Sequence, residues 1–168
     1  MGNRDQSGPE LIRRLSLYLV SLLIWANAAI AGCHLNSVEL RGPWEQARFS
    51  VELVDTAETR ARGLMFRETL PTSSGMLFVY PHPGPAGFWM KNTLIPLDML
   101  FIAADGTVES IHHDAIPHDL TPIDSLGSVK MVLEINGGLA RRMGLTPGSQ
   151  MRHPLLDQTG AIWPCSAK

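Results

Sequence analysis

The chain has 168 residues, of which 45% are hydrophobic and 18% are charged, with a formal net charge of −2 at pH 7. This length suits one domain, and the hydrophobic content excludes an intrinsically disordered chain. A negative net charge argues against a nucleic-acid binder, which is normally basic over its binding domain. Two cysteines are too few for a disulfide-rich scaffold or a four-cysteine zinc site. No nucleotide-binding motif is present, and no cofactor is expected.

The first 32 residues have the pattern of a signal peptide. Three arginines precede an uncharged apolar segment, residues 15–31, which is shorter than the roughly 20 residues of a membrane span. The segment ends in small residues, as cleavage sites do. The sequence therefore predicts export to the periplasm or cell envelope, with an uncleaved signal anchor as the alternative.

Two cleavage patterns overlap at the end of this segment. Ile30-Ala31-Gly32-Cys33 matches a bacterial lipobox, which predicts cleavage before Cys33 and a lipid on its thiol that anchors the protein to a membrane. Ala29-Ile30-Ala31 fits the A-x-A rule, which predicts cleavage after Ala31. In that case Cys33 and Cys165 are free to pair in an oxidising compartment. We expect the lipidated form and keep the disulfide as the alternative.

Residues 33–46 are expected to be a tether or a weak edge strand, residues 47–154 the folded domain, and residues 155–168 a C-terminal tail. Strands are predicted by alternating or continuous apolar residues between turn signals. Their ranges are 47–54, 76–80, 88–91, 97–103, 107–112, 129–135 and 150–153. We expect residues 47–153 to fold without the tether or the tail.

Turn and cap residues connect these strands. Asp55 with Glu58 has the spacing of a capping box and predicts a helix over residues 56–64. Asp105-Gly106 predicts a hairpin, residues 113–128 an irregular loop, and residues 139–143 a helical turn. Many short strands with two short helices predict a mainly β or α+β fold, a single compact barrel-like domain behind the signal peptide.

An ordered set of motifs between residues 51 and 151 resembles the bacterial and archaeal family called "domain of unknown function 192". The resemblance implies a compact β-rich domain, often behind an export signal, and no particular reaction. The matching residues are Arg60, Gly63-Leu64-Met65, Arg67, Gly75-Met76-Leu77-Phe78, Phe88-Trp89-Met90-Lys91-Asn92-Thr93, Pro96-Leu97-Asp98, Asp105-Gly106, Val132-Leu133-Glu134, Gly138 and Gly148.

Polar residues near an aromatic side chain in the sequence suggest a ligand cleft. An aromatic ring stacks on a ligand while polar groups orient it. Pro96 favours a bend over residues 93–96, which would bring Lys91 and Asp98 to one rim near Trp89. A cleft near Trp89 that binds a small ligand or a partner is the function we expect. Its candidate residues are Trp89, Lys91, Asn92, Asp98, Glu134, Arg60 and Arg67.

Two other functions fit the same residues. Asp98 and Glu134 each interrupt an apolar run, and paired carboxylates with split pKa values would suit a hydrolase or isomerase. Alternatively, Arg60 and Arg67 neutralise these carboxylates in a structural envelope protein. Metal binding is not expected, because the spacing of His112, His113 and His118 matches no standard site.

Overall fold

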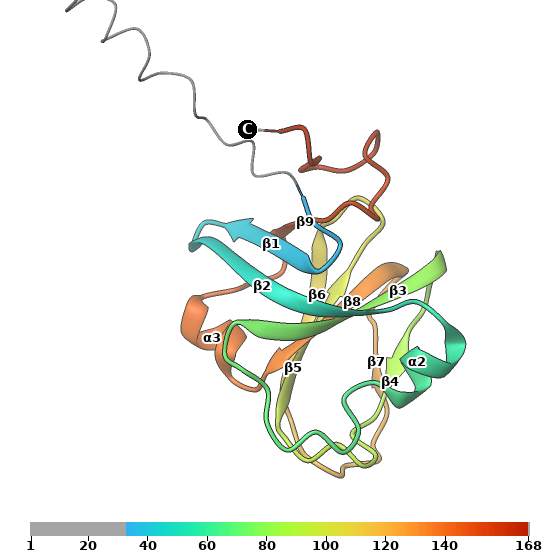
Figure 1. Cartoon of the computed structure of the whole chain (residues 1–168). Coiled ribbons are helices and arrows are strands. Elements are labelled where there is room, and N and C mark those ends of the chain that lie inside the picture. Colours follow the sequence, from blue (N-terminus) through green and yellow to red (C-terminus); the bar gives the residue numbers. More distant parts are fainter. Residues whose placement is uncertain (1–32, 168) are drawn as a thin grey trace, which may run out of the picture. The chain divides into compact units, whose positions relative to one another are not determined.

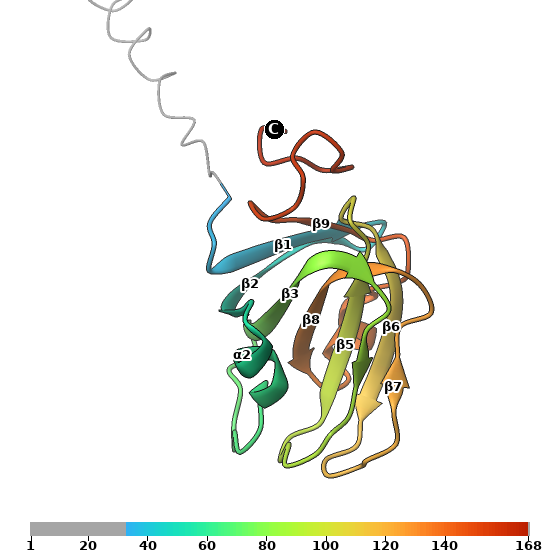
Figure 2. The same ribbon diagram turned by 90° about the vertical axis from the view of Figure 1, so that its right-hand side faces the viewer.

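The computed structural model describes residues 33–167 as a strongly curled β-sheet with two short helices (Figures 1 and 2). The strands are β1 (Ser37–Gly42), β2 (Glu45–Val54), β3 (Ser74–Gly84), β4 (Gly87–Phe88), β5 (Leu97–Ile102), β6 (Val108–Ala115), β7 (Ile123–Asp124), β8 (Val129–Asn136) and β9 (Gln150–Arg152). The helices are α2 (Ala57–Arg62) and α3 (Leu139–Met143). The predicted mainly β fold with short helices is therefore confirmed, whereas the predicted signal peptide lies outside the described residues.

The main sheet has the order β6-β5-β8-β3-β2-β1-β9, and β4 and β7 form a separate two-stranded ribbon. Its two edges approach each other, because Thr107 beside β6 pairs with Gln150 of β9. The Met151 N–H also donates to the Gly106 carbonyl at 2.7 Å. The sheet thus forms a half-barrel whose edges meet at one end. Within residues 33–167, no helix is long and apolar enough to cross a membrane.

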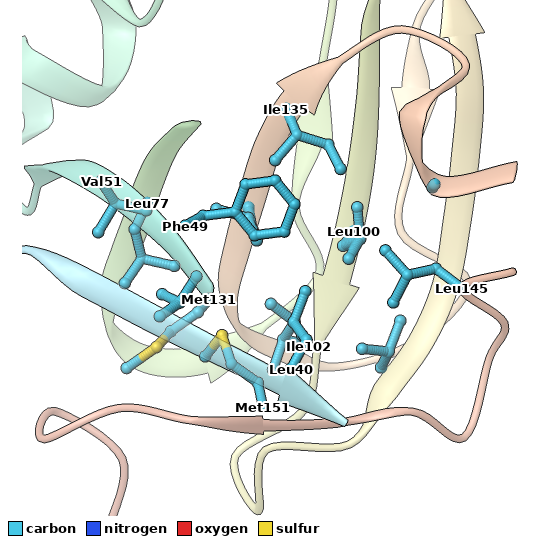
Figure 3. Packing of buried hydrophobic residues seen from close by; sticks show 14 of the residues in the cluster. Leu40, Phe49, Val51, Leu77, Leu100, Ile102, Met131, Ile135, Leu145 and Met151 are labelled. Carbon is cyan, nitrogen blue, oxygen red and sulfur yellow. The ribbon is translucent and has the colours of Figure 1, made fainter. Parts of the chain in front are cut away.

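The inner face of the curled sheet holds the larger hydrophobic core (Figure 3). Leu40 and Phe49 come from β1 and β2, and Leu100 and Ile135 come from β5 and β8. A second cluster, which includes Met76, Phe78, Met99, Phe101 and Val132, packs on the other face of the same strands. Both faces of β5 and β8 are therefore buried, which explains why their sequences are nearly continuous apolar runs.

Helix α2 begins one residue later than the capping pattern predicts. Its N-cap is Thr56, whose hydroxyl accepts from the Thr59 N–H at 3.1 Å. The Thr59 hydroxyl in turn accepts from the Thr56 N–H at 3.2 Å, so a threonine takes the role expected for Glu58. The helix ends at Gly63, which has a φ of 49° and turns the chain towards the loop after the helix.

Two other segments differ in length from their predictions. The strand expected over residues 88–91 shortens to β4, because the chain turns into the loop that carries Trp89. In contrast, β3 continues through a proline-containing segment to Gly84, which pairs with Val129 after a shift in register. Proline is tolerated at such an irregularity, where ladder hydrogen bonds are already interrupted.

The residues expected to form a tether or a weak edge strand contain an inner strand of the main sheet. Strand β1 lies between β2 and β9, and its Val38 and Leu40 side chains are 0% exposed. The expected tail is also part of the fold, since Trp163 is only 3% exposed. The Trp163 ring lies 4.4 Å from each of the Arg41 and Arg152 guanidinium carbons. The domain boundaries therefore extend beyond residues 47–154 at both ends.

A disulfide joins Cys33 to Cys165, which are 132 residues apart in sequence. The structure thus contains the disulfide that was the alternative to a lipid on Cys33. A sulfur atom in this disulfide has no valence left for a lipid thioether, so oxidation and lipidation of Cys33 exclude each other. The disulfide ties the start of the described chain to the segment that carries Trp163.

We predict that residues 47–153 alone do not unfold cooperatively, contrary to the expectation from sequence. Removing β1 deletes Val38 and Leu40 from the inner core and exposes an edge of β2. Losing two fully buried aliphatic side chains costs several kcal/mol, which is a large fraction of a domain's stability of about 5–15 kcal/mol. Circular dichroism during heating, compared with residues 33–168, measures this. A sharp transition for the short fragment would contradict it.

Candidate functional site

A cavity of about 140 Å³ lies between α2, β3, β4 and β8. It is on the face of the sheet that carries the second hydrophobic cluster, which we call the outer face. Figure 1 shows α2 and the β4–β7 ribbon on the same side of the sheet. We call it the Glu134 cavity, after the acidic residue in its wall. Its lining residues include Arg60, Arg62, Phe78, Tyr80, Phe88, Trp89, Thr93 and Glu134.

Glu134 lies on β8 in the middle of the sheet and is 4% exposed. It is paired in register with Met76 of β3 and Met99 of β5, so its side chain shares their outer face. Among residues 33–167, no hydrogen-bond donor or cation contacts its carboxyl group. A buried carboxyl group without a partner is costly to ionise, because burial removes the water that stabilises its charge.

This burial raises the pKa of Glu134 from 4.5 to about 8. The cause is desolvation, which disfavours the charged form of an acid. At neutral pH the carboxyl group is therefore mostly protonated and presents both an O–H donor and a carbonyl acceptor to the cavity. Perturbed acids in a cavity mark candidate functional sites.

Arg60 and Tyr80 line the same cavity as Glu134. The Arg60 Nη1 donates to the carbonyl of Val79, in the middle of β3, at 2.9 Å and to the carbonyl of Asp55, just after β2. Its guanidinium lies 5.1 Å from the Tyr80 ring. The pKa of Tyr80 is raised, mainly because the side chain is buried. The positive charge of Arg60 opposes this rise, and Glu134 adds to it. Tyr80 thus lies within electrostatic range of both Arg60 and Glu134.

Aromatic rings form the opposite wall. Phe88 packs edge-to-face on Phe78 at 5.1 Å and on Phe101 at 6.0 Å, which anchors β4 on the outer core. Trp89 follows directly and is 50% exposed, with the Lys91 ammonium 5.1 Å from its ring. An exposed tryptophan at the edge of a partly aromatic cavity offers a stacking surface for a ligand.

The loop that carries Trp89 is held by two neighbouring loops. The Phe66 N–H donates to the Asn92 carbonyl at 2.8 Å, and the His118 N–H donates to the Met90 carbonyl at 3.1 Å. Phe66, Asn92 and His118 have φ values of 65°, 56° and 64°, in the left-handed region, where Asn and His are enriched but Phe is uncommon. Such conformations cost about 1–3 kcal/mol each and often cluster at functional sites.

Asp98 does not belong to this cavity. Its side chain is 0% exposed, and its carboxylate accepts hydrogen bonds from the N–H groups of Asp114 (2.8 Å), Gly138 (2.9 Å) and Ala140 (2.7 Å). The N-cap of α3 is Gly138, which has no side chain to cap the helix. Asp98 supplies that acceptor from β5 instead, so its role is structural.

The sheet separates Asp98 from Glu134. Asp98 is paired in register with Ile135, whereas Glu134 is paired with Met99. Successive side chains on a strand point to opposite faces, so Asp98 shares the face of Ile135 and Glu134 the face of Met99. The two carboxyl groups therefore lie on opposite faces, and a hydrolase or isomerase that uses both on one substrate is excluded.

Of the remaining predicted site residues, some lie at the cavity and others do not. Arg60, Trp89 and Glu134 line the cavity, and Lys91 lies over Trp89 at its mouth. Asn92 contacts the Met65 sulfur at 3.9 Å and supports the loop. Arg67 forms an exposed ion pair with Glu52 at 2.5 Å and lies outside the lining. The predictions that Lys91 and Asp98 share one rim near Trp89 and that Arg60 or Arg67 neutralises Asp98 or Glu134 are therefore wrong for the residues that the structure describes.

The three histidines do not converge. His112 and His113 are neighbours on β6 and point to opposite faces, and the His113 Nδ1 lies 4.0 Å from the Asp98 carboxylate. His118 lies in the loop below Trp89. Within residues 33–167, no group of three or more His, Cys, Asp or Glu side chains is arranged to hold a metal ion.

Sequence reasoning missed Tyr80 and Thr93 as lining residues. Tyr80 has the same parity as Met76 and Phe78 along β3, which is a readable signal for a shared face. The sequence does not show that this face also meets β8 and α2. Thr93 is 5% exposed and comes from the loop after Trp89, for which no periodic signal exists.

Comparisons with solved structures identify similar chains. One is a protein of unknown function from Novosphingobium aromaticivorans, with 43% identity, a TM-score of 0.68, and coverage of 68% of this chain and 82% of that one. Another is a candidate transcription regulator from Sinorhizobium meliloti, with 40% identity, a TM-score of 0.68, and coverage of 72% and 95%. The comparison with curated proteins finds no match.

These similarities define a class of small half-barrel domains. The model of the DUF192 family, described as "Uncharacterized ACR, COG1430", matches residues 38–153. The chain belongs to the DUF192 family, which confirms the resemblance seen in the motifs. The family match begins at Val38 in β1, in agreement with the structural role of that strand.

We predict that Glu134→Gln changes the pH dependence of stability. The folded-state pKa of Glu134 is raised from 4.5 to about 8, so the folded protein binds more protons than the unfolded chain between these values. The free energy of unfolding of the wild type therefore falls as pH rises from 5 to 9, by about 3–5 kcal/mol from this group. In Glu134→Gln this fall is absent. Urea unfolding at several pH values measures it, with the exposed Glu109→Gln as control. Parallel profiles for Glu134→Gln and wild type would refute it.

We predict that Asp98→Asn destabilises the fold by about 2–4 kcal/mol, because an amide cannot accept all of the backbone N–H groups that the carboxylate accepts. The matched control is Asp114→Asn, which removes only an exposed ion pair with Arg141 at 3.0 Å. That change should cost below about 1 kcal/mol. Chemical denaturation of both variants decides it, and equal small losses would contradict a structural role for Asp98.

Proposed function

We propose that this DUF192 protein is exported and that its half-barrel domain binds a small ligand in the Glu134 cavity. The observation that supports this most directly is the unpartnered, buried Glu134 in an aromatic-lined cavity. A carboxyl group in a purely structural role would be expected to find a partner, as Asp98 does. Glu134 instead faces a space that a ligand can fill.

The wall of the cavity suits specific binding. Phe88 is fixed by two aromatic contacts, and Arg60 is fixed by two backbone carbonyls. Groups that are held in place before a ligand arrives lose little conformational entropy when it binds. Trp89 and Lys91 are exposed at the mouth, where they can close over a ligand.

Export is supported by the disulfide between Cys33 and Cys165. Disulfides persist in oxidising compartments and are rare in the reducing cytosol. This favours cleavage after Ala31, with an unlipidated Cys33, over membrane anchoring through a lipid on Cys33.

We predict that a screen of cell-envelope metabolites by thermal unfolding finds compounds that raise the Tm of the wild type, because a ligand stabilises the folded state by mass action. Trp89→Ala should lose most of this shift. The control Leu126→Ala removes a side chain that is 88% exposed and does not line the cavity, and it should keep the shift. If no compound raises the Tm, or if the shift persists in Trp89→Ala, the proposed cavity function fails and a structural envelope protein is favoured.

We predict that protein purified from the bacterial envelope has both cysteines protected from alkylation until it is reduced. The reason is the disulfide between Cys33 and Cys165. Intact-mass spectrometry with and without reductant measures this and also reports the N-terminus. A lipid adduct on Cys33 with a freely alkylated Cys165 would establish the lipoprotein form instead.

A further inference from the structure

We infer that the Glu134 cavity takes a small organic carboxylate, whose carboxylate group binds Glu134 and Arg60 while its apolar part packs on Phe88 and Trp89. This inference rests on the proposed function and names its ligand class. It follows from three features of the cavity: its size, the sign of the charges around it, and the donors that remain free inside it.

The size of the cavity limits the ligand to about one ring. Its volume is about 140 Å³. An apolar cavity of about 150 Å³ in another protein holds one benzene molecule. A benzoate-sized acid, or a shorter aliphatic acid, therefore fits with its polar end towards one wall. A nucleotide or an oligosaccharide does not fit inside the cavity.

The charges around the cavity favour an anion. Arg60 and Arg62 of α2 line it, and Lys91 lies at its mouth beside Trp89. Lys130, on the same face of β8 as Glu134, is held by the carbonyls of Tyr80 and Pro81 at 2.6 and 2.9 Å. Among residues 33–167, Glu134 is the only acidic residue that lines the cavity. Positive charge around a low-dielectric cleft attracts anions and repels cations.

The free donors inside the cavity match a carboxylate. Glu134 is buried without a partner, so it holds a proton that it can donate to an oxyanion. Two carboxyl groups in close contact cannot both ionise, and they share one proton instead. Among the hydrogen bonds of residues 33–167, Arg60 uses only Nη1, which leaves its other N–H groups for the second oxygen. Because Glu134 and Arg60 line the same cavity, we place one oxygen of the carboxylate on each of them.

A cationic ligand is the main competitor, since aromatic rings attract ammonium groups. Both suitable rings already carry a cation of the protein. The Arg60 guanidinium lies 5.1 Å from the Tyr80 ring, and the Lys91 ammonium lies 5.1 Å from the Trp89 ring. An amine would have to displace these groups or bind between them. The occupied rings thus favour the carboxylate.

The test uses benzoate, benzylamine and benzamide, which share a ring but differ in charge. Calorimetric titration of the disulfide-bonded protein, residues 33–168, is carried out at pH 6.5 and pH 9. We expect benzoate to bind most tightly of the three. We also expect its Kd to rise about tenfold at pH 9, because the pKa of Glu134 is about 8 and only about a tenth of the protein then holds the proton. The other charged or titratable groups around the cavity are Arg60, Arg62, Lys91, Lys130 and Tyr80, and burial raises the pKa of Tyr80.

Two variants separate the roles of the residues. Glu134→Gln keeps a neutral donor at the same place, so it should still bind benzoate but lose the pH dependence. Arg60→Met should weaken benzoate binding at least tenfold, whereas the control Arg67→Met, whose residue lies outside the cavity, should not. If Arg60→Met fails to fold, the pH dependence of wild type and Glu134→Gln still decides the question.

Other outcomes overturn the inference in distinguishable ways. If benzylamine binds most tightly, and more tightly at pH 9 than at pH 6.5, the cavity binds cations, and the proposed ligand-binding function survives. If benzamide binds as well as benzoate at both pH values, the ligand is neutral, and that function also survives. If none of the three binds, the carboxylate inference is wrong, and the metabolite screen with Trp89→Ala alone decides the proposed function.

Discussion

The burial of both faces of β8 is the constraint on which the site depends. This strand lies between β5 and β3, so its apolar side chains enter one of two hydrophobic clusters. A carboxyl group there must find a partner, take up a proton or face a cavity. Glu134 has no partner among the described residues, and it faces the cavity beneath α2. The raised pKa of Glu134 and its place in the cavity wall thus both follow from its position on β8.

Asp98 shows the other solution to the same problem. It is as deeply buried as Glu134, but it lies on the opposite face and near the start of α3. Three backbone N–H groups satisfy it there. The two residues therefore have different roles in one sheet. Asp98, whose carboxylate is hydrogen-bonded, stabilises the fold, whereas Glu134, which has no hydrogen-bond partner among the described residues, can respond to a ligand.

The ends of the chain complete the half-barrel. Strand β1 fills the gap between β2 and β9, and Trp163 packs between two arginines near that edge. The His153 Nε2 lies 3.0 Å from the Leu35 carbonyl, and burial lowers the pKa of this histidine. Its neutral ring therefore links the two terminal segments, which the disulfide also joins. These contacts lie at the opposite end of the sheet from the loops of the cavity mouth (Figure 1).

The sequence by itself determined the family, the mainly β class, most strands and the Asp105-Gly106 hairpin, because alternation, turn residues and ordered motifs are local signals. It also singled out Trp89, Arg60 and Glu134, which do line one cavity. Only the tertiary structure decided that Asp98 and Glu134 lie on opposite faces, because this depends on which strands pair and in which register. It likewise decided that β1 and Trp163 belong to the core. These segments are buried by residues that are far away in the sequence, so their local sequence pattern does not predict their burial.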